Sequence, residues 1–379
     1  APFIEVIDEI KAAGGEVYKL CFQCGLCDAV CPWNKVRTFS IRKIIREAAF
    51  GLSEVEGEDI WRCTTCGTCP AHCPRGVKQI EVSVALRRLA SEYEMFPASV
   101  KPARTARASL ISEGNPLQGE RAKRAEWAKG LSIKTYAEGM EALYFVGCYF
   151  SYDPRMKKVA QATVNILKKA GVNFGILGEK ENCCGESIRK TGSEKVFKKL
   201  AKENIKTFID NGVKKIIVSS PHCYHTFKNE YPEFMVNFEV LHMNQYVLEL
   251  INAGRLQFTG EFEKTVTYHD PCYLGRHNGI YDEPRDLLNK VAGVSLVEMA
   301  ACGKNSLCCG GGGGRIWMDT PQEERFSDIR LRQAEATGAQ ILATSCPYCI
   351  TNFEESRLNL EYEDVLDVKD ITEIINEML

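Results

Sequence analysis

Hydrophobic and polar positions follow two different patterns along the chain, and the change lies near residue 141. Before it, apolar residues recur every three to four positions, as they do on one face of an amphipathic helix. This spacing predicts helices over residues 3–13, 40–52 and 77–93, and Ser40 is a suitable N-cap for the second of them. The first part of the chain is therefore expected to be helical.

From residue 141 onward, short apolar stretches alternate with amphipathic helices such as 155–170 and 193–210. The alternation predicts an α/β fold with parallel sheets and helices on their faces. Ligands of such sheets bind at the carboxyl edge of the strands, and several of these strands run into a cysteine. The predicted strands are 142–147, 172–177, 214–220, 264–269, 294–299 and 339–345.

Two segments of the helical part hold eight cysteines in one repeated pattern, C-x2-C-x2-C-x3-C-P. This spacing binds two cubane 4Fe–4S clusters, with the fourth cysteine of each run ligating the other cluster. One predicted cluster has the ligands Cys21, Cys24, Cys27 and Cys73, and the other has Cys63, Cys66, Cys69 and Cys31.

A pair of zinc sites is the alternative interpretation, but zinc motifs usually group cysteines in separated pairs. The 31 residues between Cys31 and Cys63 have a helical pattern, whereas a compact ferredoxin has only a short connection there. We therefore expect a mostly helical ferredoxin module over residues 1–95, which carries single electrons.

Residues 96–140 form a predicted connector with the turn signal Gly114-Asn115-Pro116. From 96 to 134 it has eight Lys or Arg residues against three Asp or Glu residues. This excess fits a docking surface for an acidic partner, or a solvated helical arm that wraps the following domain.

The whole chain has 379 residues, 18 cysteines and a formal net charge of −2. This charge balance does not favour a nucleic-acid partner. Cysteines in cluster spacings, with no secretory signal before them, favour a reducing cytoplasm over disulfide formation. No apolar stretch reaches the roughly 18–20 residues that span a bilayer, so we expect any membrane association to come through a partner.

The second half of the chain contains an internal duplication. Corresponding landmarks lie 124, 125 and 123 residues apart, a near-constant offset typical of a repeat. We expect a first lobe over 141–255 and a second over 256–379, facing each other across a cleft with the cysteines at the interface. The landmarks are Cys148, Cys183-Cys184-Gly185 and Cys223 in one unit, and Cys272, Cys308-Cys309-Gly310 and Cys346-Pro347-Tyr348-Cys349 in the other.

These adjacent-cysteine units resemble the CCG domains of the heterodisulfide reductase family. A two-cluster ferredoxin followed by two such units resembles the fused catalytic subunits of that family, known as its D-type subunits. The same arrangement is similar to the iron–sulfur subunits of sulfite-reductase-linked complexes, glycolate and lactate oxidases, and flavoprotein- or acyl-CoA-linked oxidoreductases. The resemblance covers essentially the whole chain, and its most specific segments are 268–285, 308–315 and 345–349.

The resemblance implies that a complete CCG unit supplies five cysteines to a noncubane 4Fe–4S cluster. The second unit has all five, Cys272, Cys308, Cys309, Cys346 and Cys349. The first unit has four, because a fixed offset of 123 places Thr226 at the position of Cys349, and a hydroxyl is a poor replacement for a thiolate on iron. Four cysteines could hold a smaller or altered cluster, completed by His222 or His225.

Five consecutive glycines, Gly310 to Gly314, follow the second cysteine pair. A phosphate-binding loop would need a Gly-Lys-Ser/Thr ending, which is missing. We favour a steric interpretation, in which Gly310, Gly311 and, in the first unit, Gly185 let the backbone approach a bulky cluster and donate N–H groups to its sulfur.

Several polar residues lie near these cysteines in sequence. His269 and His277 flank Cys272, and such histidines could shuttle protons at neutral pH or have a packing role. Arg276 and Arg315 could hold a substrate carboxylate or phosphate, or balance the charge of the cluster. Cys302 belongs to neither pattern and is expected to be a small buried residue.

Two functions remain open at this point. The resemblance implies an oxidoreductase subunit whose second CCG cluster performs thiol–disulfide chemistry, with His269 as the nearby proton donor and a disulfide as substrate. The alternative is a non-catalytic relay between a flavoprotein and a quinone or another carrier. The resemblance implies flavoprotein or quinone-reactive membrane subunits as partners, in anaerobic metabolism. An open cleft at the second site would favour catalysis, and a sealed one the relay.

Overall fold

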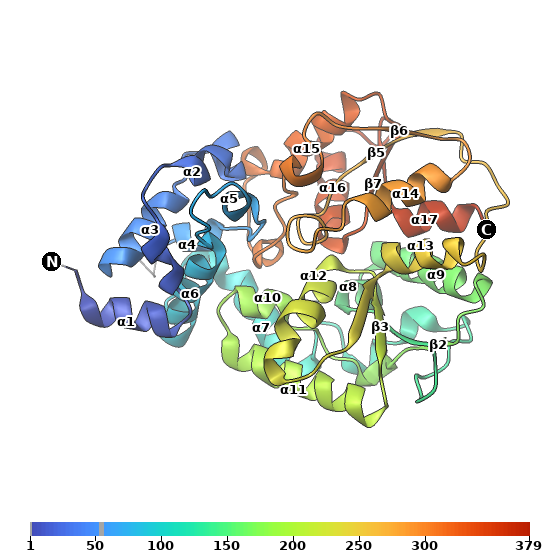
Figure 1. The fold of residues 1–379 in the computed structure, drawn as a ribbon, viewed down its shortest axis with the longest axis horizontal. Coiled ribbons are helices and arrows are strands. Elements are labelled where there is room, and N and C mark those ends of the chain that lie inside the picture. The colour runs from blue at the N-terminus through green and yellow to red at the C-terminus, as the bar shows by residue number, and fades with distance from the viewer. Residues whose placement is uncertain (1, 53–56) are drawn as a thin grey trace.

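The computed structural model of the chain describes residues 2–52 and 57–379. Residue 1 and residues 53–56, which belong to the predicted ferredoxin module, lie outside the described residues. A helical module that contains the N-terminus lies beside two α/β lobes (Figure 1). The predicted fold class is therefore confirmed. No helix among the described residues is both long and apolar enough to cross a membrane.

The ferredoxin module is built from short helices around an apolar core. Helix α3 begins after Ser40, whose hydroxyl accepts a hydrogen bond from the Lys43 backbone N–H at 3.0 Å, and ends at Gly51 with a φ of 66°. It buries Ile44 and Ile45 against the other helices. The helices are α1 (Ile4–Ala12), α2 (Leu26–Val30), α3 (Ile41–Phe50), α4 (Asp59–Arg62), α5 (Thr68–Ala71) and α6 (Gln79–Glu92).

The connector contains helix α7 (Lys101–Glu113) and then follows the first lobe. Its backbone bonds to that lobe at two places: Tyr136 N–H donates to Ile176 O at 2.9 Å, and Gly114 O accepts from Cys183 N–H at 2.7 Å. The connector is therefore an arm that packs along the first lobe.

The first lobe has a parallel sheet of four strands in the order β2-β1-β3-β4. Apolar strands β1 and β3 form its centre, which helices cover. Its elements are β1 (Ala142–Phe145), α8 (Cys148–Tyr152), α9 (Pro154–Lys169), β2 (Phe174–Gly175), α10 (Glu186–Lys190), α11 (Glu194–Asp210), β3 (Lys215–Val218), α12 (Pro221–His225), β4 (Glu239–His242) and α13 (Met243–Asn252).

The second lobe repeats this sheet, with parallel strands in the order β6-β5-β7-β8. The identical strand order in both lobes agrees with the duplication. The edge strands β4 and β8 were not predicted, because each carries charged residues that weaken the apolar signal. The elements are β5 (Lys264–Tyr268), α14 (Asp282–Lys290), β6 (Val294–Val297), α15 (Phe326–Glu335), β7 (Ile341–Thr344), α16 (Pro347–Asn359), β8 (Asp367–Asp370) and α17 (Ile371–Glu377).

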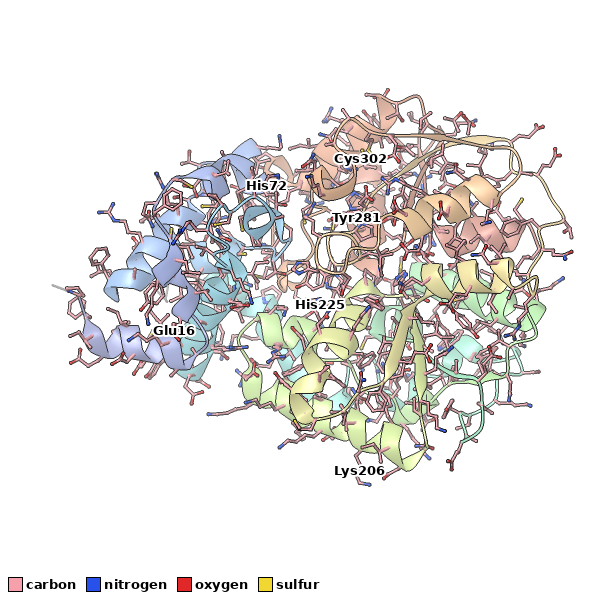
Figure 2. All side chains as sticks on the ribbon, viewed as in Figure 1. Glu16, His72, Lys206, His225, Tyr281 and Cys302 are labelled. Carbon is pink, nitrogen blue, oxygen red and sulfur yellow. The ribbon has the colours of Figure 1, made fainter. Side chains whose placement is uncertain are left out.

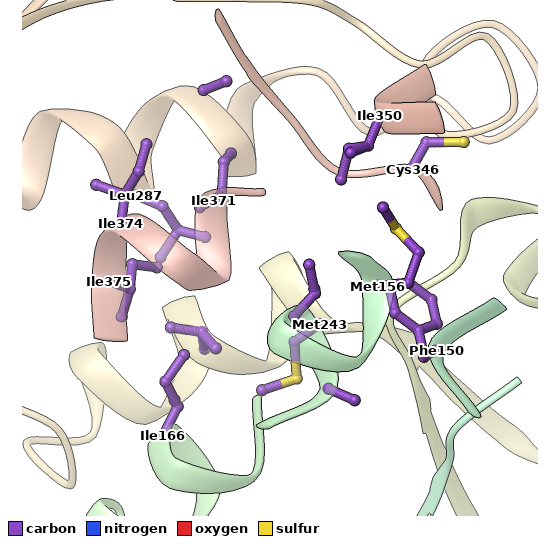
Figure 3. Close-up of a cluster of buried hydrophobic side chains, with 14 of the residues drawn as sticks. Phe150, Met156, Ile166, Met243, Leu287, Cys346, Ile350, Ile371, Ile374 and Ile375 are labelled. Carbon is purple, nitrogen blue, oxygen red and sulfur yellow. The ribbon is translucent and has the colours of Figure 1, made fainter. Parts of the chain in front are cut away.

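The two lobes share one hydrophobic core. Ile166 on α9 and Met243 on α13 face the α17 side chains Ile371, Ile374 and Ile375, all of which are buried (Figure 3). At the edge of this contact, the Arg155 guanidinium binds the carboxylates of Glu354 and Glu373 at 2.9 and 2.7 Å. The lobes are thus fixed against each other by a mostly apolar interface with a charged rim.

Arg87 on α6 joins the ferredoxin module to both lobes. Its side chain is fully buried and donates to Ile60 O at 2.8 Å and Cys63 O at 2.7 Å within the module. It also donates to Gly313 O at 2.8 Å and Lys190 O at 3.1 Å, one in each lobe. A single guanidinium therefore satisfies four carbonyl groups from three parts of the fold.

Replacing Arg87 by methionine is expected to loosen the ferredoxin module. Each buried carbonyl left without a donor costs about 1–3 kcal/mol, so the loss should exceed about 3 kcal/mol. Anaerobic thermal unfolding and limited proteolysis between the module and the lobes would measure it, with the exposed Arg46→Met as the control. A melting temperature equal to that of the control would contradict this role of Arg87.

Candidate iron–sulfur sites

All 18 cysteines are free thiols, and 17 of them gather in four groups. Among the described residues, no set of three or more His, Cys, Asp and Glu side chains surrounds a single metal-ion position. The fit to iron–sulfur clusters therefore rests on the donor chemistry: unpaired thiols, backbone N–H groups that point at sulfur, and glycines packed closely beside them.

The first group lies near the surface of the ferredoxin module. Its four thiols line one small cavity together with the exposed side chains Phe22 and Leu26. The Val77 N–H donates to the Cys73 sulfur at 3.4 Å. Cys24 is exposed, so this group has access to solvent. The four cysteines are Cys21, Cys24, Cys27 and Cys73.

The second group lies deeper, toward the lobes. Burial, together with the neighbouring thiols of Cys66 and Cys63, raises the pKa of Cys31 above its usual range. Burial, together with the thiols of Cys63, Cys66 and Cys31, also raises the pKa of Cys69 well above its usual value. The Thr65 N–H donates to the Cys63 sulfur at 3.4 Å. The structure thus brings Cys31 from the first run together with three cysteines of the second run.

The second lobe buries five thiols at the carboxyl ends of its strands. Cys272 follows β5, Cys346 precedes helix α16, and Cys349 lies in the first turn of α16. The Cys349 and Cys309 sulfurs are 3.3 Å apart, and the Gly310 N–H donates to the Cys308 sulfur at 3.3 Å. Hydrogen bonds from Cys308 and Cys349 outweigh burial and lower the pKa of Cys309 to about 5, which favours the thiolate that binds metal.

The first lobe buries four thiols in a corresponding place. Cys148, Cys183, Cys184 and Cys223 line one narrow cavity together with Ser220. The Gly185 N–H donates to the Cys183 sulfur at 3.4 Å, as Gly310 does in the second lobe.

The structure corrects the position of the missing fifth cysteine. Pro221 and Pro347 both begin a helix after equivalent central strands, β3 and β7, so the lobes match here at an offset of 126 rather than 123. Ser220 therefore stands where the second lobe has Cys346, and Cys223 stands where it has Cys349. Thr226 lies farther along the helical segment, because the offset of 123 came from pairing Cys223 with Cys346, whereas the structural partner of Cys223 is Cys349, three residues later.

The glycine run packs against the backbone of the ferredoxin module. A Cβ on Gly312 would lie 2.4 Å from Thr64 O, and one on Gly313 would lie 2.5 Å from Cys63 O. Gly310 and Gly185 have φ values of 97° and 93°, which favour glycine. The need for glycine at positions 312 and 313 therefore comes from main-chain oxygens of residues 63–64, and the approach of Gly310, Gly311 and Gly185 to a cluster stays a prediction.

Residues 63–66, which we call the 63–66 loop, are surrounded by the second lobe. Tyr273 OH and the Thr65 hydroxyl are 2.8 Å apart, and the His277 ring bonds Thr65 O at 2.8 Å. The Cys308 thiol contacts the Thr64 hydroxyl at 3.8 Å and shares a hydrogen bond with Cys66. Two cysteine groups from different domains therefore meet at this loop, a contact that sequence spacing alone did not indicate.

A column of aromatic rings fills the space between the two lobe sites. Successive ring centroids are 5.1 Å apart for Tyr149 and Tyr348, 4.2 Å for Tyr348 and His222, 4.1 Å for His222 and Tyr273, and 4.4 Å for Tyr273 and His277. The cleft expected between the lobes is thus occupied by side chains. The sequence signal was that an aromatic residue directly adjoins a cysteine in both units.

His222 belongs to the first lobe but contacts the second-lobe site. Its Nδ1 is 3.3 Å from the Glu186 carboxylate, and its ring hydrogen-bonds the Cys346 thiol. Although burial opposes the shift, Glu186 and Cys346 raise the pKa of His222 to about 10. Despite its own burial, the pKa of Glu186 is lowered to about 2 by His222. The pair is therefore ionic at neutral pH.

The surroundings of His269 do not suit the role of proton donor that the sequence predicted for it. Its Nδ1 accepts a hydrogen bond from Arg330 Nε at 3.1 Å, and its ring packs on Phe353. Burial and the charges of Arg330 and Arg276 lower the pKa of His269 well below its usual value. A neutral imidazole held in this way does not supply protons near pH 7, and His222 is the histidine beside Cys346.

The structure also places Cys302 and His225. Cys302 is half-buried rather than buried, and Figure 2 shows it in the second lobe. His225, near the centre of Figure 2, lines a cavity of about 630 Å³ with Pro70 and His277, where the ferredoxin module meets both lobes.

An open cavity of about 330 Å³ reaches the second-lobe site from another side. Its lining includes Cys309, Gly310, Asn352 and the guanidinium of Arg315. The Arg315 side chain is 6% exposed and has no carboxylate within ion-pair distance among the described residues. Burial and the nearby guanidinium charges lower its pKa to about 10. Arg315, unlike Arg276, therefore faces a space that a small anion can enter.

Two family models match this chain. The model described as "Cysteine-rich domain" (CCG) matches residues 142–228 and 266–354. The model described as "4Fe-4S dicluster domain" matches residues 18–77. These matches confirm the arrangement of a two-cluster ferredoxin followed by two CCG units.

Relatives of this chain are named as redox proteins. The chain is 38% identical over 329 residues to "Probable iron-sulfur-binding oxidoreductase FadF" of Bacillus subtilis, covering 84% of this chain and 46% of that protein. It is 36% identical over 336 residues to the EtfAB:quinone oxidoreductase of Syntrophomonas wolfei, covering 85% and 46%. The chain thus spans about half the length of these two relatives.

A third relative matches along nearly its whole length. It is the D-type subunit of the dihydromethanophenazine:CoB--CoM heterodisulfide reductase of Methanosarcina barkeri. The two are 31% identical over 391 residues, which cover 95% of this chain and 93% of that relative.

The corrected position of the missing cysteine can be tested by restoring it. Ser220→Cys gives the first lobe a fifth thiol at the place of Cys346, so bound iron and acid-labile sulfide per chain should rise after anaerobic reconstitution. Thr226→Cys is the matched control and should leave both values at the wild-type level. A rise in the Thr226 variant alone would contradict the structural match of the two lobes.

Proposed function

Because this chain belongs to the family of heterodisulfide reductase D-type subunits, we propose that it is an electron-transfer subunit in which the ferredoxin module exchanges electrons with the second-lobe site. The observation that carries this proposal is the contact of the 63–66 loop with Cys308, Gly312 and Gly313. In this proposal the domains are residues 1–95, the connector 96–140, and the lobes 141–255 and 256–379.

We assign a cofactor to each cysteine group by its donors. The two groups of the ferredoxin module would hold cubane 4Fe–4S clusters, and the five thiols of the second lobe a noncubane one. The four thiols of the first lobe, with Ser220 in place of a fifth, would hold a smaller or altered cluster. When bound, these groups supply one-electron transfer.

The protein residues hold the two donor groups in contact and keep water out. Thr64 and Thr65 lie between the thiols of the module and those of the second lobe, and Tyr273 and Cys308 contact their hydroxyls. The glycines permit this approach because no Cβ separates the two backbones. The exposed group around Cys24 is the natural exchange point with a partner.

The names of the relatives suggest the partners that we propose for this chain. One relative is named an EtfAB:quinone oxidoreductase, which favours a flavoprotein on one side and a quinone-reactive membrane component on the other. The first-lobe site lacks one thiol, and the space between the lobes is filled by aromatic rings. Both features favour a relay through the second lobe over a substrate held between two clusters.

The electron route can be tested by separating the two backbones. Gly312→Ala places a Cβ against Thr64 O and should slow reduction of the second-lobe cluster several-fold, without loss of iron. Gly260→Ala is the matched control, because its Cβ would meet only ordinary contacts. Rapid-freeze EPR after mixing with a reduced ferredoxin measures the rate, and equal rates in the two variants would contradict this route.

A second candidate function is thiol–disulfide chemistry at the second lobe, and the cavity beside Cys309 favours it. Reducing one disulfide to two thiols takes two electrons and two protons. In this scheme the electrons come from the ferredoxin module and the protons from solvent in the cavity. The buried Arg315 guanidinium would bind a carboxylate on the substrate.

The two functions are distinguished by the response to small thiols. Under mild oxidation, mercaptoacetate should give a new paramagnetic signal from the second-lobe cluster, and Arg315→Gln should weaken it. The neutral mercaptoethanol serves as the control, because its response should not depend on Arg315. A chain with full iron content and no response to either thiol would support the relay.

A further inference from the structure

Arg276 crosses from the second lobe to the ferredoxin module. It follows Cys272 by four residues, and its Nε donates to Cys66 O at 2.7 Å. Its Nη1 donates to Ser306 O at 2.7 Å and to Lys304 O at 3.2 Å. The guanidinium therefore lies between a thiol-bearing residue of the module and the segment that leads into Cys308.

The charge of Arg276 has no carboxylate partner. No Asp or Glu among the described residues lies within ion-pair distance of it, and its Nη2 is buried without an acceptor. By contrast, Arg124 beside the Cys148 thiol is paired with Glu181 at 2.6 Å, and Arg285 is paired with Asp270 at 2.7 Å. The groups facing Arg276 that become negative when ionised or bound to metal are the thiols of Cys66, Cys272 and Cys308, with a smaller influence from the Tyr281 hydroxyl.

We propose that Arg276 is a positioning residue for electron transfer: a fixed cation shared by the Cys66 group and the second-lobe group, which raises the reduction potential of both. The proposal rests on the proposed function, because it requires clusters in these two groups. Each added electron increases the negative charge of a cluster, and a nearby cation in a poorly solvated setting stabilises the reduced form.

An arginine suits this place better than a lysine would for structural reasons. Its planar fork reaches three carbonyl oxygens at once and keeps its charge at every accessible pH. Because the carbonyls that it binds are neutral, its charge remains available to the sulfur groups. The hydrogen bonds fix the distance between the two groups, and the charge sets how readily each accepts an electron.

The test compares reduction potentials in three full-length variants, reconstituted anaerobically and titrated with EPR detection. Arg276→Gln removes the charge, Arg276→Lys retains it, and the exposed Arg332→Gln makes the same net charge change at a remote site. In Arg276→Gln we expect the reduced-to-oxidised ratio of both clusters, at fixed ambient potential, to fall on the order of tenfold. One unit charge roughly 10 Å away has this effect at an effective dielectric constant of about 20.

The remaining measurements serve as controls. The exposed cluster around Cys24 should keep its potential in every variant, and Arg276→Lys and Arg332→Gln should match the wild type. A fully loaded Arg276→Gln chain with unchanged potentials overturns the role of Arg276 and leaves the proposed function standing. If the Gln variant fails to load, Arg276→Met, which also removes the charge, is titrated in its place: lowered potentials of both clusters support the role of the charge, and unchanged potentials overturn it.

Failure of the proposed function has a different signature. A wild-type chain that binds iron only in the ferredoxin module gives no second-lobe signal at all. That result would overturn both proposals before any variant is compared, whereas failure of the Arg276 inference requires both clusters to be present and unresponsive to the substitution.

Discussion

The carbonyl oxygens of residues 63–66 meet groups that come from other parts of the chain. Cys63 O accepts from Arg87, Thr65 O from the His277 ring, and Cys66 O from Arg276, while Thr64 O lies against Gly312. A backbone carbonyl buried without a donor is costly, so this loop can be buried only where these partners stand. The position of the ferredoxin module relative to the second lobe depends on this set of contacts, and with it the distance between two groups of thiols.

The duplicated lobes have diverged in what they contribute. Both keep the same parallel sheet, the paired cysteines and the glycine that follows them. The second lobe keeps five thiols and an open cavity. The first lobe has Ser220 in place of one thiol, and its His222 lies beside Cys346 of the second lobe. The rings of Tyr273 and Tyr348 pack against this histidine, so the first lobe contributes a side chain to the surroundings of the second-lobe site.

Local patterns in the sequence predicted local structure well. The helix after Ser40 and the central strands follow from periodicity, because each depends on which faces are buried. The edge strands β4 and β8 were missed because their charged residues interrupt the apolar pattern on which these predictions depend. The match of Thr226 to Cys349 was wrong, because the offset was counted from Cys223 to Cys346, whereas the proline that begins the helix in both lobes aligns Cys223 with Cys349. The environment of the 63–66 loop and the unpaired charge of Arg276 arise from residues more than 200 positions apart, and no short-range pattern encodes such contacts.

The burial of the 63–66 loop also bears on how the protein is assembled in the cell. Cys66 is only 7% exposed once the second lobe covers it, whereas Cys24 remains at the surface. A maturation factor that delivers iron and sulfide can reach the outer thiols at any time. Cys66 is accessible only before the second lobe covers it, so under the proposed function a cofactor would reach this thiol before the final docking of the domains. The order of biogenesis would then be set by the same close backbone contact that brings the two sites together.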